Sequence, residues 1–205
     1  MNRIGACIKR GAAVAAILVM SMLSGCATAY VDTTLKDLKA EDRVKVANAQ
    51  PVQLVFEFQT KGTPNSQATE MLKPVVLKAV QESGAFTQIT ETPPANKALL
   101  HIAINNVALS DDAFAKGFVT GFTFGLVGST VGDGYICTLD YFPAGGGPKI
   151  TKSERDAIYT SLGATASTPQ HAQKMPGLEQ AVNFMARKIV ANAVNELAKD
   201  PAFGK

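Results

Sequence analysis

The sequence has 205 residues, and its 20 Lys and Arg residues nearly balance 17 Asp and Glu residues. The small positive excess lies at the beginning of the chain, in Arg3, Lys9 and Arg10, and without these three the two signs are equal at 17 each. No basic stripe remains for a nucleic-acid-binding surface, and this class of function is excluded.

The first predicted unit, residues 1–25, is a secretory signal peptide. Its basic start is followed by a run without charge from Gly11 to Gly25, which is the usual pattern of such a segment. The run has 15 residues, whereas a membrane-spanning helix needs about 20. An uncleaved N-terminal anchor is the alternative.

The signal ends in Leu23-Ser24-Gly25-Cys26, which resembles the lipobox of bacterial lipoproteins. The resemblance implies that the signal peptidase recognises Leu23, Ser24 and Gly25 and cuts before Cys26. Cys26 then has a covalent diacylglycerol and usually a further acyl chain such as palmitate, enough for stable membrane attachment. Ala27 follows instead of an aspartate, which by the same resemblance favours the periplasmic face of the outer membrane.

Cysteine usage agrees with this hypothesis. Cys7 would leave with the signal and Cys26 would be acylated, so Cys137 alone would remain as a thiol. The mature chain then has no intramolecular disulfide. Cys137 lies in the predicted strand YICTLDYF, where we expect it to be a buried core residue.

Residues 26–50 are mostly polar and are predicted to be a tether, with a short helix near residues 35–39. Residues 51–205 are long enough for one domain. Alternating apolar residues predict a strand over 52–59. Helical spacing predicts a helix over 66–86, in which Gly84 is a natural C-cap and Pro74 marks a kink or the first turn.

The remaining elements follow in order along the domain. Strands are expected over 86–92 and 98–109, and a hairpin over 135–142 and 149–162, with a Gly-rich turn between its strands. The last helix is expected from residue 178 and to end before Pro201, because an apolar stripe repeats there every three or four residues. The pattern predicts an α+β two-layer sandwich, with a mostly antiparallel sheet of about five strands and two helices on one face.

Residues 113–134 form an apolar, Gly-rich insert. No charge occurs from Gly117 to Gly132. Three interpretations remain open: a hairpin packed on the domain, a membrane contact beside the acyl chains, or a helix packed closely on a partner. The candidate membrane or partner contacts are Phe118, Phe122, Phe124, Leu126 and Val127.

No catalytic motif is found. Ser129 directly follows Gly128, which does not fit a nucleophile elbow, and no phosphate-binding loop occurs. His101 and His171 lack the spacing of metal ligands. We therefore expect no enzyme, no catalytic residue, no metal and no cofactor apart from the covalent lipid on Cys26.

The layout of lipobox, tether and compact β-α-β-β…α domain is similar to small outer-membrane lipoproteins of proteobacteria, among them lipopolysaccharide-assembly and transport-auxiliary lipoproteins. We expect a lipid-anchored, non-catalytic binding or assembly module for a cell-envelope component. Its expected partners are the lipid bilayer, through Cys26, and an envelope protein or lipid, without nucleic acid. The alternatives are an oligomeric, membrane-inserting or pore-associated lipoprotein that uses residues 113–134, and an envelope enzyme without a recognisable motif.

Overall fold

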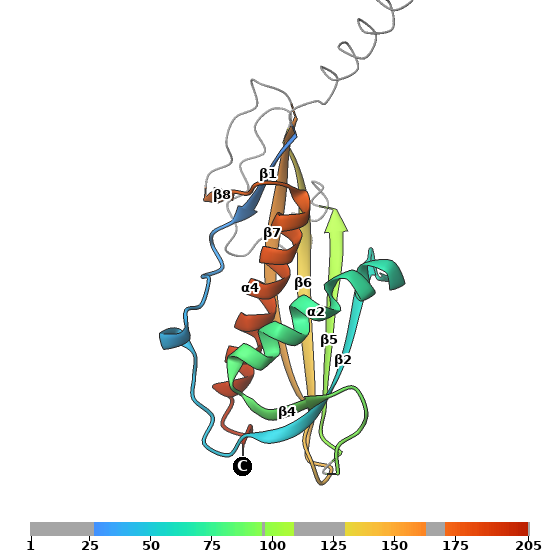
Figure 1. The fold of residues 1–205 in the computed structure, drawn as a ribbon, viewed down its shortest axis with the longest axis vertical. Helices are drawn as coiled ribbons and strands as arrows, with labels where there is room; N and C mark the ends of the chain where they lie inside the picture. The colour runs from blue at the N-terminus through green and yellow to red at the C-terminus, as the bar shows by residue number, and fades with distance from the viewer. Residues whose placement is uncertain (1–26, 96, 109–129, 163–170, 205) are drawn as a thin grey trace, which may run out of the picture.

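The computed structural model describes residues 27–95, 97–108, 130–162 and 171–204. The described residues form one sheet of eight strands, with two α-helices on one of its faces (Figure 1). The strands are β1 (Ala27–Asp32), β2 (Gln50–Thr60), β3 (Thr63–Pro64), β4 (Phe86–Thr90), β5 (Leu99–Ala108), β6 (Thr130–Phe142), β7 (Ile150–Leu162) and β8 (Ala172–Lys174). The helices are α2 (Ser66–Ser83) and α4 (Leu178–Ala198), with a 3-10 turn, η1, at Ala40–Asp42.

The sheet is mixed but mostly antiparallel. Its strand order is β3-β2-β5-β6-β7-β1-β8, and β4 pairs with β2 outside this path. Only β4 and β5 run parallel to β2, while the other described pairs are antiparallel. The expected mostly antiparallel sheet with two helices on one face is therefore found.

The expected number of about five strands is corrected to eight. The five expected strands correspond to β2, β4, β5, β6 and β7, and the additional ones are β1, β3 and β8. β3 and β8 have only two and three residues, too few for a periodic pattern. β1 is buried on both faces, with Val31 in the main core and Tyr30 in a second cluster, so its sequence does not alternate between apolar and polar.

Helix α2 begins and ends at capping residues. The Asn65 side-chain oxygen accepts a hydrogen bond from the Ala68 amide at 3.0 Å. Gly84 ends the helix in the left-handed conformation with φ 68°, so its predicted role as C-cap is confirmed. Pro74 lies inside the helix and not in its first turn.

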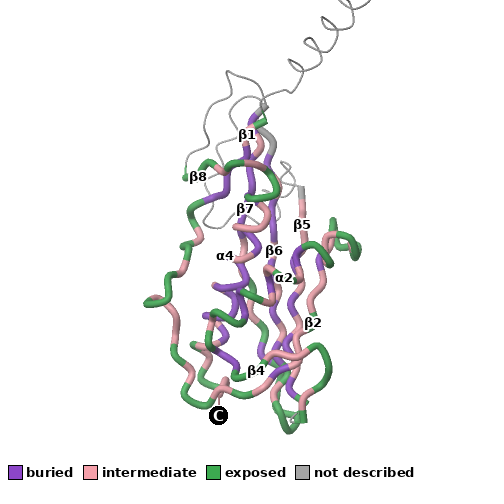
Figure 2. The backbone as a smooth tube through the Cα atoms, viewed as in Figure 1, coloured by how far each residue is buried: buried purple, intermediate pink, exposed green. Residues whose placement is uncertain are grey.

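The main core lies between the sheet and the two helices (Figure 2). On the sheet, Leu100, Ile102, Cys137, Leu139 and Ile158 point toward the helices and are fully or almost fully buried. Helix α4 is buried along most of its length, which confirms the expected C-terminal helix with an apolar stripe. Its buried residues include one charged side chain, Lys188.

Candidate functional site

The predicted lipidation and contact residues lie outside the described residues. These are Leu23, Ser24, Gly25 and Cys26 of the lipobox and Phe118, Phe122, Phe124, Leu126 and Val127 of the insert. The described residues on either side of these segments show where the segments join the domain. The first candidate site is the part of the sheet where these segments join it.

The chain enters the sheet at the residue after Cys26. Ala27 begins β1 and pairs with Leu162 of β7, and the pairing continues to Val31 and Ile158. On its other edge, β1 pairs with β8, with Tyr30 opposite Lys174. The structure therefore differs from the tether expected over 26–50, because its first residues after Cys26 form an inner strand of the sheet.

The ends of the apolar insert join the same end of the sheet. Thr130 pairs with Ser161, next to the pair of Ala27 and Leu162. Ala108, the last residue of β5, pairs with Asp133 of β6. Thr130 therefore lies beside the start of β1, whereas Ala108 is level with Val31 and is separated from β1 by β6 and β7.

A buried polar cluster holds β1 against β7 and α4. The Lys188 ammonium lies 3.0 Å from Oδ2 of Asp156 and donates a hydrogen bond of 2.5 Å to the backbone carbonyl of Asp32. The Tyr159 hydroxyl donates to Oδ2 of Asp32 at 3.0 Å. Asp32 is therefore bound from both faces of the sheet, through its carbonyl on the helix side and through its side chain on the other.

The electrostatics of this cluster follow from its burial. Burial raises the pKa of Asp156 to about 7, and the nearby Lys188 ammonium opposes this shift. The Asp156 Oδ1 atom accepts the Ala157 amide at 2.9 Å. Its Oδ2 atom forms the ion pair with the Lys188 ammonium. Burial, followed by the neighbouring Asp32, raises the pKa of Tyr159 above its usual value.

The other two candidate chemical groups, Cys137 and His101, lie in paired strands of the sheet. Cys137 is fully buried, as predicted, and burial raises the pKa of its thiol. His101 lies in β5 opposite Asp140 of β6. Within the described ranges, no three His, Cys, Asp or Glu residues are grouped to hold a metal ion. No helix among the described residues is long and apolar enough to cross a membrane.

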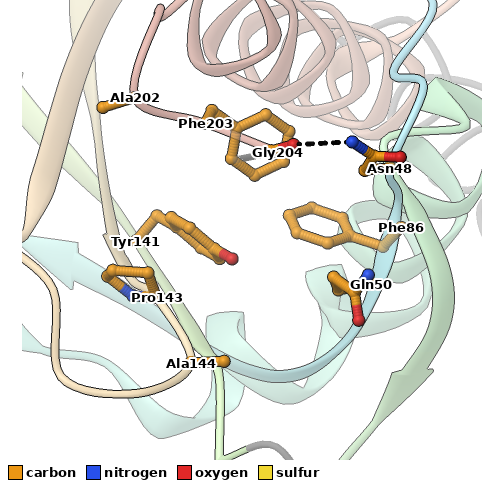
Figure 3. Close-up of a pocket in the computed structure, with 9 residues that line it drawn as sticks. All are labelled: Asn48, Gln50, Phe86, Tyr141, Pro143, Ala144, Ala202, Phe203 and Gly204. Atoms are coloured by element: carbon orange, nitrogen blue, oxygen red, sulfur yellow. Dashed lines mark hydrogen bonds between the residues drawn. The ribbon is translucent and has the colours of Figure 1, made fainter.

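An aromatic hollow lies where the C-terminal residues pack on the domain. The rings of Phe86, Tyr141 and Phe203 surround it, with centroids 5.0 to 6.0 Å apart, and Figure 3 shows the Tyr141 hydroxyl pointing into it. Asn48 donates to the Gly204 carbonyl at 3.3 Å beside these rings. The hollow measures about 60 Å³, well below the roughly 300–1,000 Å³ of small-molecule sites. Its contacts hold the C-terminal residues on the core.

A larger hollow lies between β2, α2 and β4. It measures about 240 Å³. Its lining is mainly apolar, and a charged pair, Lys73 and Glu91, stands beside it with the side-chain ends 3.1 Å apart. It is separate from the start of β1 and was not predicted from the sequence.

No protein-family model matches the sequence, and no curated protein matches it. Several solved structures are distantly similar. A PelC dodecamer from Paraburkholderia phytofirmans has 10% identity and a TM-score of 0.36 over 74% of this chain and 90% of that one. A neuraminyllactose-binding hemagglutinin homolog from Helicobacter pylori has 12% identity and a TM-score of 0.38 over 78% of this chain and 89% of that one. The rare lipoprotein B from Shewanella oneidensis has 11% identity and a TM-score of 0.34 over 71% of this chain and 93% of that one. No property of these proteins is transferred to this chain.

Proposed function

We propose that this protein is a lipid-anchored, non-catalytic binding or assembly module of the bacterial cell envelope, attached through acylated Cys26 to the periplasmic face of the outer membrane. The observation that supports it is the pairing of Ala27 with Leu162, directly after the predicted acylation site. An acyl chain on Cys26 would be joined to an inner strand without a spacer. The domain would then stand with this end of the sheet next to the bilayer.

The buried cluster supports the same arrangement. Lys188 and Tyr159 hold Asp32 at the end of β1, only six residues beyond Cys26. A strand fixed at both ends limits how far the domain can swing from its anchor. A binding surface elsewhere on the domain would keep a defined height above the membrane.

Metabolic labelling with a palmitate analogue tests the anchor. The unchanged protein should be labelled and should lose residues 1–25, which mass spectrometry of the mature protein measures. Cys26→Ser should abolish both labelling and cleavage. Cys7→Ser is the matched control and should leave both unchanged; label that persists in Cys26→Ser would refute the proposal.

A membrane-inserting role for the insert is a second candidate. Thr130, a described residue of the insert, pairs with Ser161 beside the pair of Ala27 and Leu162, so the insert joins the sheet next to the proposed anchor. Flotation of residues 27–205 with liposomes tests this role in the absence of acyl chains. Flotation that is lost when residues 113–132 are deleted would support insertion, and no flotation of either form would refute it.

A further inference from the structure

The backbone groups of β2 point alternately to its two edges, and contacts on both sides define which residues face which edge. The Gln53 amide donates to the Ala98 carbonyl at 3.0 Å, toward β5. The Phe58 amide instead donates to the Thr69 hydroxyl at 2.9 Å, and the Phe58 carbonyl accepts the Asn65 amide at 2.8 Å, both at the opposite edge. Because the direction alternates along a strand, the backbone of Phe56 also faces that opposite edge.

This edge of β2 is covered at its two ends and open in the middle. β4 pairs with β2 as far as Gln53, and β3 pairs only with Gln59 and Thr60. No other described strand pairs with this edge between them, so the Phe56 amide and carbonyl have no strand partner there among the described residues. An open edge of this kind is a template for another extended chain.

The 240 Å³ hollow lies beside the open edge. Leu54 and Phe56 of β2 form one wall, Leu77 of α2 a second, and Ile89 of β4 a third. We call these four residues and their hollow the edge groove. Its volume is below the roughly 300–1,000 Å³ of cofactor-sized pockets, but it has room for an apolar side chain.

The charged pair beside the edge groove consists of a cation, Lys73, and an anion, Glu91. Lys73 and Glu91 are bound to each other, but their side chains are 40% and 71% exposed, so solvent screens the pair and its opening costs little. A surface with one cation and one anion complements a ligand that also has both signs. A polypeptide segment with a basic and an acidic residue meets this condition.

We infer that the edge groove binds an extended peptide segment of a partner protein. The segment would add a short strand to β2, pairing its backbone with the amide and carbonyl of Phe56 and placing one apolar side chain in the hollow. A lipid acyl chain could fill the hollow, but it has no donor or acceptor for Phe56. This inference names a partner class for the proposed binding role, and it does not depend on acylation of Cys26.

The test uses the protein as cells produce it, in lipid nanodiscs if it is acylated and in buffer if it is not. The probes are fluorescent seven-residue peptides that alternate Thr with Val, Ile, Leu or Phe and have Lys and Glu at their ends. We expect saturable binding by fluorescence anisotropy for at least one peptide, and hydrogen exchange at the Phe56 amide slowed about tenfold or more. Lipid attachment is measured separately, so failure of the anchor leaves the peptide result interpretable.

Two variants and one modified peptide show whether the peptide occupies the edge groove and whether it binds by strand addition. Leu77→Glu places a charge in the edge groove and should weaken binding by about tenfold or more, or about 1.4 kcal/mol. Gln81→Glu makes the same change of charge one turn along α2, outside the groove, and should leave binding unchanged. A peptide whose edge-facing amides are N-methylated should lose about tenfold or more in affinity, whether or not Leu77→Glu folds.

The inference is overturned if no peptide of the set binds up to about 1 mM, a limit that corresponds to about −4 kcal/mol. It is also overturned if the N-methylated peptide binds as well as its parent, because the groove would then recognise only apolar bulk. Displacement of the peptide by dodecanoate with no change in Phe56 exchange would identify a lipid site instead.

Discussion

The ammonium of Lys188 lies 3.0 Å from the carboxylate of Asp156, and their side chains are only 2% and 0% exposed. This pair joins the centre of α4 to β7, next to the strand that follows Cys26. Removing two charges from water costs several kcal/mol, so such a pair adds little net stability. Losing one partner is different, because the other charge stays buried.

The first prediction concerns Lys188→Met. At about pH 8 the substitution leaves Asp156 buried without its cation, and we expect the free energy of unfolding to fall by about 3–5 kcal/mol. Urea denaturation followed by circular dichroism measures this change. Lys78→Met, at a position whose side chain is 71% exposed, is the control and should change stability by less than about 0.5 kcal/mol. The double variant Lys188→Met, Asp156→Leu should recover most of the loss; equal losses in single and double variants would contradict this account.

The second prediction concerns the pH dependence of stability. In the folded protein burial raises the pKa of Asp156 to about 7, while its value in the unfolded chain is about 3.9. Between these two values the folded state keeps a proton that the unfolded state has released. The contribution of Asp156 is therefore fully present below about pH 4 and is lost as the pH rises to about 7, by at most about 1.4 kcal/mol per pH unit.

The difference in unfolding free energy between the unchanged protein and Asp156→Asn isolates this contribution from other titrating groups. Lys188, Asp32 and Tyr159 interact electrostatically with Asp156 and remain in both proteins. The difference should fall steadily from about pH 4 to 7. A difference that rises over this range would show that the Lys188 charge outweighs burial.

The third prediction concerns the thiol of Cys137. It is fully buried, and burial raises its pKa above the usual value, so little thiolate is available for reaction. At about pH 8 we expect Ellman's reagent to react with it only as fast as the core opens. In guanidinium chloride the reaction should be complete within mixing. Leu139→Ala, at a buried position of the same strand, should speed the native reaction by loosening the core, and an equally fast reaction in both conditions would place the thiol at the surface.

Five strands and both helices could be predicted because each has one apolar and one polar side. In β2 and β5 the alternation is regular, and in α4 the stripe continues over 21 residues. β1 gives no such signal, because both of its faces are buried, with Val31 in the main core and Tyr30 in the second cluster. It therefore looked like part of a polar tether.

The buried cluster has only a weak signal in the sequence. Asp156 alternates in phase with Ile150 and Ile158, both core residues, and Lys188 is next to the buried Ile189. Charged residues in phase with apolar ones suggest a buried pair. The partners of such residues depend on which strand lies beneath which helix, which local periodicity does not contain. The lipobox, by contrast, is a contiguous motif and stays a prediction from the sequence alone.

The last prediction concerns Asn65, which closes the end of the open β2 edge and begins α2. The backbone amide of Asn65 donates to the Phe58 carbonyl at 2.8 Å, and its side-chain oxygen accepts a hydrogen bond from the Ala68 amide at 3.0 Å. Asn65→Ala removes both side-chain contacts, with the Ala68 amide and with the Thr60 hydroxyl, but keeps the backbone bond, and it should lower the free energy of unfolding by about 1 kcal/mol. Asn65→Asp keeps the acceptor and adds a negative charge at the helix N-terminus, so it should retain full stability or gain a few tenths of a kcal/mol. Urea denaturation of the three proteins distinguishes these effects. If Asn65→Asp were as unstable as Asn65→Ala, the contact of the side-chain nitrogen with the Thr60 hydroxyl would be the important one, because the aspartate cannot donate it.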